Sequence, residues 1–219
     1  MMKNEKKILR ILVTKKDNFE KIKSNNNYQS DLIFCEKGQF YIGSKSNHKY
    51  EKKIEIIKGI IKFEKEEELK ELTKMIIEII NVSIKEVKLK TSDSTVGAER
   101  EKNIIEGMVA SCVIRCSYES VPMIHFINQI FIRILVGHYF VNGNKRIGIM
   151  TLRNILFWSG YYLKFSSTYR LMDLKKYELI CEKFVKNLQG KNCSNFELKE
   201  VIDIRQWIEN NIIFAKKLL

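Results

Sequence analysis

Residues 137–150, GHYFVNGNKRIGIM, combine side chains that suit anion binding and proton transfer. Gly143 and Asn144 stand at the expected start of a helix, where unpaired N–H groups and the bare glycine backbone let an anion approach closely. Lys145 and Arg146 add two positive charges there, and Arg can hold a phosphate through two parallel hydrogen bonds. A phosphate site is physically well motivated here, but these four residues alone fit a basic helix start without a ligand at least as well.

His138 lies five residues before this glycine, at the expected end of the preceding helix. An imidazole at that place is suited to take a proton from an attacking hydroxyl while the helix start holds a phosphoryl donor. Phosphoryl transfer requires little more than positioning, charge neutralisation and a base or orienting group. The alternative is that His138 caps the helix by interacting with its last carbonyl groups. Phe140 is expected to point into the core and to anchor the loop.

Two apolar helices are expected to position this loop. Helical spacing of apolar residues after Pro122 predicts a largely buried helix up to the loop, and residues 144–160 predict a second one. Residues 65–80, 99–117 and 173–188 predict amphipathic helices. A capping box of Ser194 and Glu197 is expected to begin the last helix.

The first 65 residues have a different pattern, with short apolar runs that predict strands and a hairpin turn at residues 36–39. The polar stretch at residues 90–98 is the best candidate for a domain boundary. The expected fold class is therefore mostly α. A helical bundle over about residues 95–215 lies in a domain of residues 91–219, after a small mixed α/β region of residues 1–90.

Composition limits the classes of function. The chain has 219 residues, of which 45% are hydrophobic and 30% charged, as in globular proteins. No apolar run reaches the roughly 18–20 residues of a membrane span, and the lysine-rich start lacks a long apolar segment. We therefore expect a cytoplasmic protein without a membrane partner. The five cysteines form no CxxC pair and are expected to be reduced core residues rather than metal ligands.

The net charge of +13 raises the question of nucleic-acid binding. Residues 1–90 carry 21 basic and 14 acidic residues, and the remainder carries 18 and 12, so neither half holds the excess. Lys outnumbers Arg by 31 to 8, whereas the readout of base edges relies on Arg. Nucleic acid is therefore expected only as a non-specific polyanion partner.

The run HYFVNGNKR resembles the motif of the Fic/Doc (fido) family, His-Pro-Phe-x-Asp/Glu-Gly-Asn-Gly/Lys-Arg. The family's loop also lies between two buried helices of an all-helical bundle. The Doc branch is the more similar, because it has Lys where many Fic enzymes have Gly and lacks the second Arg that Ile149 replaces here. Its upstream segment is also similar to residues 95–109. The matching positions are His138, Phe140, Gly143, Asn144, Lys145 and Arg146.

The resemblance implies a fido-type helical bundle and a protein-modifying transferase. His138 would be the general base that activates a Ser, Thr or Tyr hydroxyl of a target protein. Gly143, Asn144 and Lys145 would form the anion hole for the phosphates of ATP or another nucleoside triphosphate, with Arg146 on a terminal phosphate. Doc-type members transfer phosphate and Fic-type members transfer AMP. The Doc branch further implies a toxin that a separate antitoxin controls.

Two positions depart from the family motif. Tyr139 replaces Pro, which Doc-like members tolerate. Asn142 replaces the Asp or Glu that holds Mg²⁺, and an amide oxygen can coordinate Mg²⁺ but lacks the charge of a carboxylate. Either metal binding is weakened, or another acid helps, or the nucleotide chemistry differs. The alternative function is therefore a catalytically degenerate fido-fold module that binds a protein or a nucleic acid.

Overall fold

The computed structural model describes residues 8–12, 33–36, 39–44, 49–57, 63, 65–159, 161–163 and 174–214. The chain forms two compact units, one of residues 60–212 and one of residues 1–59 with 213–219. The proposed motif lies in the first of these.

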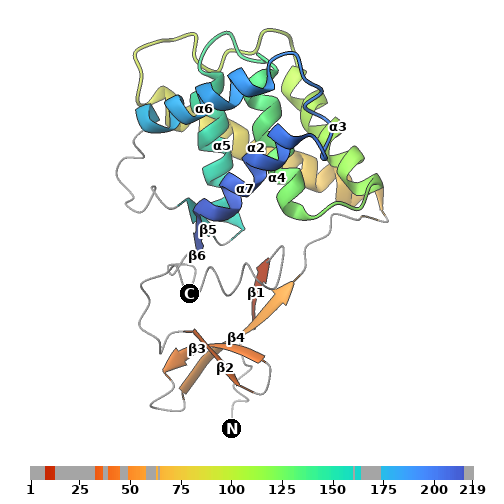
Figure 1. The fold of residues 1–219 in the computed structure, drawn as a ribbon, viewed down its shortest axis with the longest axis vertical. Coiled ribbons are helices and arrows are strands. Elements are labelled where there is room, and N and C mark those ends of the chain that lie inside the picture. The colour runs from red at the N-terminus through yellow and green to blue at the C-terminus, as the bar shows by residue number, and fades with distance from the viewer. Residues whose placement is uncertain are drawn as a thin grey trace. The chain divides into compact units, whose positions relative to one another are not determined.

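The unit of residues 60–212 is mostly helical, which confirms the predicted α-rich fold class for the described residues (Figure 1). None of its helices, within the ranges described, is long and apolar enough to cross a bilayer. The short strand β5 completes the described elements that lie wholly within this unit, and β6 begins at its last residue. The bounds are α2 Glu66–Lys88, α3 Ile104–Tyr118, α4 Met123–Val136, α5 Asn144–Trp158, β5 Tyr161–Leu163, α6 Leu174–Leu188, α7 Lys199–Asn211 and β6 Ile212–Phe214.

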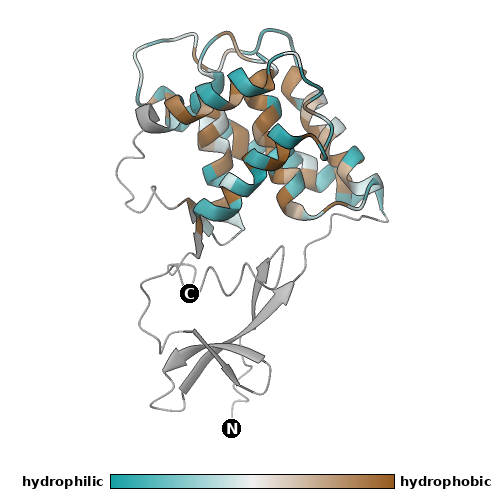
Figure 2. Cartoon of the chain, viewed as in Figure 1, coloured by the Kyte–Doolittle hydropathy of each residue, from teal (hydrophilic) through white to brown (hydrophobic). Residues whose placement is uncertain are grey.

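Helices α4 and α5 form the centre of the core, as their apolar sequences predict. α4 packs against α3, α5, α6 and α7, and α5 packs against α2, α4 and α6. Phe126, Ile130 and Ile134 of α4 are fully buried, and so are Ile149 and Leu152 of α5. Figure 2 shows hydrophobic residues on all the helices of this unit, α4 and α5 among them. The loop between them is therefore held at both ends by buried helices.

Helix α2 belongs to the helical unit rather than to a separate N-terminal domain. Ile76 and Ile80 are buried as the helical spacing predicts, although Met75, expected on the same face, is 39% exposed. α2 packs against α3 and α5, and the chain divides near residue 60 instead of residue 90. The polar stretch at residues 90–98 is thus a connection inside the helical unit.

Polar side chains on α4 fix the C-terminal part of the unit. The buried Asn128 donates its Nδ2 hydrogen to the Val201 carbonyl at 2.9 Å. Arg133 donates from its outer guanidinium nitrogen to the Ser194 hydroxyl at 2.8 Å. Ser194 does not cap the last helix, because α7 begins only at Lys199 and Leu198 is the residue at its N-terminal boundary.

The described residues of the other unit form a four-stranded sheet in the order β1-β4-β3-β2. β1 runs parallel to β4, whereas β2–β3 and β3–β4 are antiparallel. Glu36 is paired with Gln39, which is where the sequence places a turn. The expected mixed α/β region is thus divided, since its helix belongs to the helical unit. The strands are β1 Ile8–Leu12, β2 Ile33–Glu36, β3 Gln39–Ser44 and β4 Lys49–Ile57.

Candidate anion and transfer site at the start of helix α5

Gly143 forms the N-terminal boundary of α5 in a conformation that favours glycine. Its φ angle is +86°, in the left-handed region that residues with a Cβ atom rarely adopt. A Cβ atom there would also stand 2.9 Å from the Cγ1 atom of Val96, in the connection between α2 and α3. Glycine is therefore required at the loop–helix junction both by the backbone conformation and by the close approach of Val96.

The first turn of α5 exposes backbone donors. The Ile147 N–H makes the first hydrogen bond of the helix, to the Gly143 carbonyl at 2.8 Å. No described residue accepts a hydrogen bond from the N–H groups of Asn144, Lys145 or Arg146. Three unpaired donors at a helix N-terminus carry partial positive charge and point along the helix axis. This is the backbone geometry that the sequence predicted for an anion site.

The Asn144 side chain closes the loop. Its Oδ1 atom accepts a hydrogen bond from the Phe140 N–H at 3.1 Å, and its Nδ2 atom donates to the Phe140 carbonyl at 2.9 Å. Phe140, expected to anchor the loop, has a fully buried side chain. The Asn144 amide is therefore occupied within the loop, and only the backbone N–H of this residue is available to an anion.

Both cations at the start of α5 lie against acids of α6. The Lys145 Nζ atom is 2.8 Å from Glu182 Oε1, and the Arg146 Nε atom is 3.2 Å from Glu178 Oε1. The Arg146 pair is the less exposed, with side-chain exposures of 24% and 36%. Ile149, where the family has a second Arg in many members, is fully buried. The two adjacent cations at the start of α5 are thus already paired with acids.

His138 projects from the loop in an unusual backbone conformation. It is exposed, and its φ angle of +49° is uncommon for a residue other than glycine. No hydrogen bond joins its imidazole to any described residue, so capping of α4 by this ring is not observed. Tyr139 folds back over Gly137, where a Cβ atom would collide with the tyrosine ring. The imidazole is therefore accessible to a substrate.

The connection between α2 and α3 lies along the loop, a contact that the sequence analysis missed. The Gly97 N–H donates to the Asn142 carbonyl at 3.2 Å, and the Arg100 N–H donates to the Tyr139 carbonyl at 2.9 Å. A third backbone hydrogen bond, of 2.8 Å, joins the Val141 N–H to the carbonyl of residue 98. Residues 93–100 therefore form one wall of the site.

Asp93 brings a carboxylate to Asn142 from this wall. The Nδ2 atom of Asn142 donates to Asp93 Oδ2, and its Oδ1 atom accepts from the Gly143 N–H at 2.7 Å. Asp93 Oδ1 accepts hydrogen bonds from the Thr95 hydroxyl at 2.6 Å and the Thr95 N–H at 2.9 Å. These Thr95 bonds, then the Asn142 bond and the Arg146 charge, lower the pKa of Asp93 below its ordinary value. Asp93 is thus a carboxylate anion at neutral pH.

The oxygen atoms near the start of α5 could coordinate a cation that binds together with nucleotide phosphates. The described residues contain no group of three or more His, Cys, Asp or Glu side chains arranged to hold a metal. Mg²⁺ needs fewer protein ligands than that, because one or two carboxylates can hold it together with substrate phosphates and water. Asp93 offers a hard oxygen ligand of this kind, whereas the Asn142 oxygen, the doubtful ligand of the sequence analysis, is already bonded to the Gly143 N–H.

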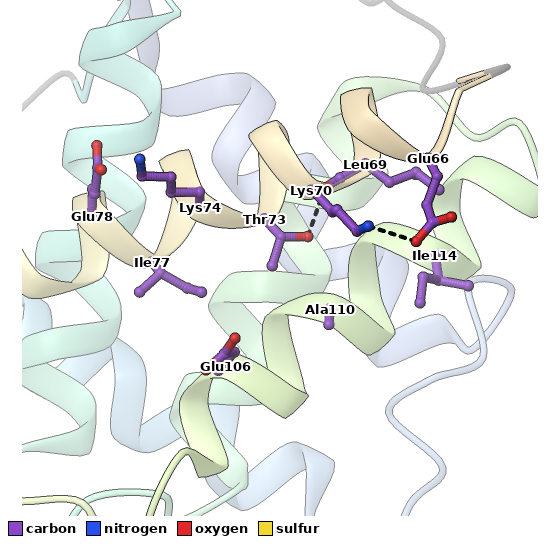
Figure 3. Close-up of a pocket in the computed structure, with 10 residues that line it drawn as sticks. All are labelled: Glu66, Leu69, Lys70, Thr73, Lys74, Ile77, Glu78, Glu106, Ala110 and Ile114. Atoms are coloured by element: carbon purple, nitrogen blue, oxygen red, sulfur yellow. Dashed lines mark hydrogen bonds and ion pairs between the residues drawn. The ribbon is translucent and has the colours of Figure 1, made fainter.

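A groove elsewhere on the unit contains none of the motif residues. It lies between α2 and α3, has a volume of about 620 Å³, and is lined by the apolar side chains of Leu69, Ile77 and Ile114 (Figure 3). Its edge carries the exposed ion pair of Lys70 with Glu66, at 2.8 Å. With acids and bases intermixed at its edge, the groove lacks the convergent cationic groups found at the start of α5.

No family model, no curated protein and no solved structure matches the chain. The cysteines do not contribute to the candidate site, since Cys112, Cys116 and Cys181 are free and buried.

Proposed function

We propose that the chain is a Doc-like transferase of the Fic/Doc type, which moves phosphate or AMP from a nucleoside triphosphate to a Ser, Thr or Tyr hydroxyl of a target protein. One observation carries the proposal. Unpaired N–H groups, Lys145 and Arg146 lie at the start of α5, and the loop that leads into this helix presents the accessible imidazole of His138. Anion binding and proton transfer are thereby combined in one connection of the fold.

In the proposed reaction His138 takes the proton of the target hydroxyl as its oxygen attacks phosphorus. A new P–O bond forms to the target, and the P–O bond to the leaving group breaks. ADP leaves when the γ-phosphorus is attacked, and pyrophosphate leaves when the α-phosphorus is attacked. The N–H groups of Asn144 to Arg146 and the two cationic side chains stabilise the phosphate oxygens. Mg²⁺, when bound, would neutralise further phosphate charge.

Of the two groups that could be transferred, we propose phosphate rather than AMP. The resemblance associates Lys at position 145 with the Doc branch, and the buried Ile149 leaves α5 without a second arginine at its first turns. A toxin role under the control of an antitoxin follows from the same branch and is part of this proposal. The target hydroxyl belongs to a protein.

Intact-mass measurement tests the proposal directly. A pool of lysate proteins is incubated with the full chain, ATP and Mg²⁺, in parallel with His138→Asn. This variant removes the base, and Asn tolerates the left-handed conformation of residue 138. We expect a gain of one phosphate that depends on His138. A gain of AMP would assign Fic-type chemistry, and no gain with any nucleoside triphosphate would contradict transfer.

The second candidate is a binding module without catalysis. The ion pairs Lys145–Glu182 and Arg146–Glu178 favour it, because they neutralise the cations that a nucleotide would need. A binding module keeps its partner after His138→Asn, whereas a transferase loses its product. If the partner is a nucleic acid, its affinity should fall steeply as salt increases.

A further inference from the structure

Helix α6 presents two acids to the two cations at the start of α5. Glu178 and Glu182 are one helical turn apart and therefore lie on the same side of α6. Glu182 Oε1 is 2.8 Å from the Lys145 Nζ atom, and Glu178 Oε1 is 3.2 Å from the Arg146 Nε atom. Both positive side chains that are proposed to hold phosphate are thus occupied by carboxylates of one helix.

The contact between Arg146 and Glu178 leaves a donor unsatisfied. The Arg146 Nε atom is buried and has no hydrogen-bond partner among the described residues. Glu178 Oε1 is close enough to form an ion pair but does not lie in line with the N–H bond. A buried N–H group without an acceptor is destabilising. An anionic oxygen that meets this N–H bond in line would therefore be a better partner than Glu178.

Helix α6 does not depend on these ion pairs for its position. A different, apolar side of the helix packs into the unit, where Cys181 and Leu188 are buried. Phe184 adds edge-to-face ring contacts, with centroid distances of 6.4 Å to Phe131 of α4 and 5.4 Å to Trp207 of α7. The two acids are 36% and 52% exposed, and ion pairs this exposed are weak. The carboxylates can therefore leave the cations by side-chain rotation while the helix stays in place.

Phosphate and carboxylate compete for the same side chains at this site. The N–H groups of residues 144–146 find no acceptor in the part of the chain that the structure describes, whereas Lys145 and Arg146 are paired. The free chain thus offers a phosphate the backbone donors but not the full charge of the two cations. An incoming triphosphate has to displace the carboxylates, and their negative charges repel it while they stay in place.

We infer that α6 is an autoinhibitory element of the proposed nucleotide site. In the free chain its two acids hold the two cations, and a triphosphate binds fully only after the carboxylates have released them. The inference rests on the proposed function, because it concerns the phosphate-binding atoms of that site. It assigns to the chain itself a restraint on nucleotide binding, separate from any antitoxin.

Calorimetric titration of ATP into Glu178→Gln/Glu182→Gln, with Mg²⁺ present throughout, tests the inference. The variant keeps the size of both side chains and removes both charges, so ATP should bind about 10-fold more tightly than to the wild-type chain. Glu67→Gln/Glu71→Gln is the matched control, because it removes two exposed charges at the same spacing on α2 and should leave the affinity nearly unchanged. An equal gain in both variants, or no gain in the α6 variant, overturns the inference.

Removing a cation should reduce the gain. Lys145→Gln leaves Glu182 without its partner, so Glu182→Gln should raise the ATP affinity less in this background than in the wild-type chain. An equal rise in the two backgrounds would mean that Glu182 merely repels the nucleotide, and it would overturn the inference. Thermal unfolding identifies the variants that are folded. If the double α6 variant is not among them, Glu182→Gln alone should give a smaller gain of the same sign.

The mass assay for transfer separates this inference from the proposed function. A tighter ATP complex of the double α6 variant without any product that depends on His138 would support autoinhibition of a nucleotide site and contradict the transferase. Transfer that depends on His138, with an unchanged ATP affinity of the variant, would overturn the inference alone. If neither the wild-type chain nor the variant binds ATP, both are contradicted.

Discussion

The Nε atom of Arg146 lies 3.2 Å from Glu178 Oε1, so the guanidinium proposed to hold a terminal phosphate already has an anionic partner. One turn farther along α6, Glu182 pairs with Lys145 at 2.8 Å. A phosphate that binds at the start of α5 therefore competes with two carboxylates of the same helix. In the proposed site, the acids of α6 would influence the affinity for phosphate as directly as its bases.

Replacing Glu178 by Gln should strengthen nucleotide binding. The variant keeps the size of the side chain and removes the charge that competes for Arg146, so the affinity for ATP should rise by several-fold, on the order of 1 kcal/mol. Calorimetric titration measures the change. Glu71→Gln, at an exposed position of α2, removes the same charge elsewhere and should have little effect. Weaker ATP binding by Glu178→Gln would mean that Glu178 positions Arg146 for the phosphate instead of competing with it.

Gly143→Ala should destabilise the protein and weaken anion binding. The left-handed φ of +86° and the 2.9 Å approach to Val96 both oppose a methyl group, at a cost of about 1–2 kcal/mol in the free energy of unfolding. Gly107→Ala provides the matched control, because a Cβ atom at this exposed position of α3 would meet nothing within 4 Å. That control should gain about 0.5–1 kcal/mol. Urea unfolding compares the two, and equal effects would contradict the conformational argument.

Asn144→Ala should open the loop. The buried Phe140 N–H loses its partner, and the Phe140 carbonyl keeps only the hydrogen bond from Arg100 Nε at 3.4 Å, which should lower the free energy of unfolding by about 1–3 kcal/mol. Asn211→Ala removes a single hydrogen bond, of 2.7 Å, to the Trp207 carbonyl near the end of α7 and should cost less. Chemical denaturation ranks the two variants. A smaller loss for Asn144→Ala than for Asn211→Ala would show that the loop does not depend on this amide.

Alkaline pH should destabilise the helical unit through its buried thiols. Burial raises the pKa of Cys116 and of Cys181 from 9.0 to about 12, because desolvation disfavours the thiolate. Below pH 9.0 both folded and unfolded chains keep the proton, so this contribution to stability is fully present. As the pH rises toward about 12 only the unfolded chain ionises, and the contribution is lost.

Urea unfolding of the wild-type chain between about pH 8 and about pH 10 measures this loss. The Cys116→Ala/Cys181→Ala variant is less stable at neutral pH but should lose less stability over that interval. A parallel decline in both proteins would assign the alkaline loss to other groups.

The central helices were predictable because their amino-acid sequences indicate that they are buried. α4 and α5 have apolar residues on so many positions that only burial accounts for them, and Pro122 precedes the first residue of α4. The left-handed Gly143 at the start of α5 agrees with the motif, which has glycine at that position. Local pattern was sufficient wherever a helix is stabilised by its own spacing of apolar residues.

Contacts between distant segments were not predictable. The polar composition of residues 90–98 suggested a boundary, but three backbone hydrogen bonds tie residues 97–100 to the loop before α5. Asp93 is hydrogen-bonded to Asn142 although the two residues are 49 positions apart in the sequence. No local sequence pattern predicts a contact over such a separation. Ser194 likewise has the sequence of a helix cap, yet its hydroxyl accepts a hydrogen bond from Arg133 of α4. In each case a tertiary partner outweighed the local preference.

The hydrogen bonds between residues 97–100 and 139–142 also determine the stage of folding at which the site forms. They join connections about 40 residues apart, so their closure has to wait until α3 and α4 have docked. Lying in irregular segments, they should open with less free energy than the amides of α4 and α5, which are protected by the core. Hydrogen exchange should then detect residues 137–143 as a local unit that opens while the helical bundle stays folded.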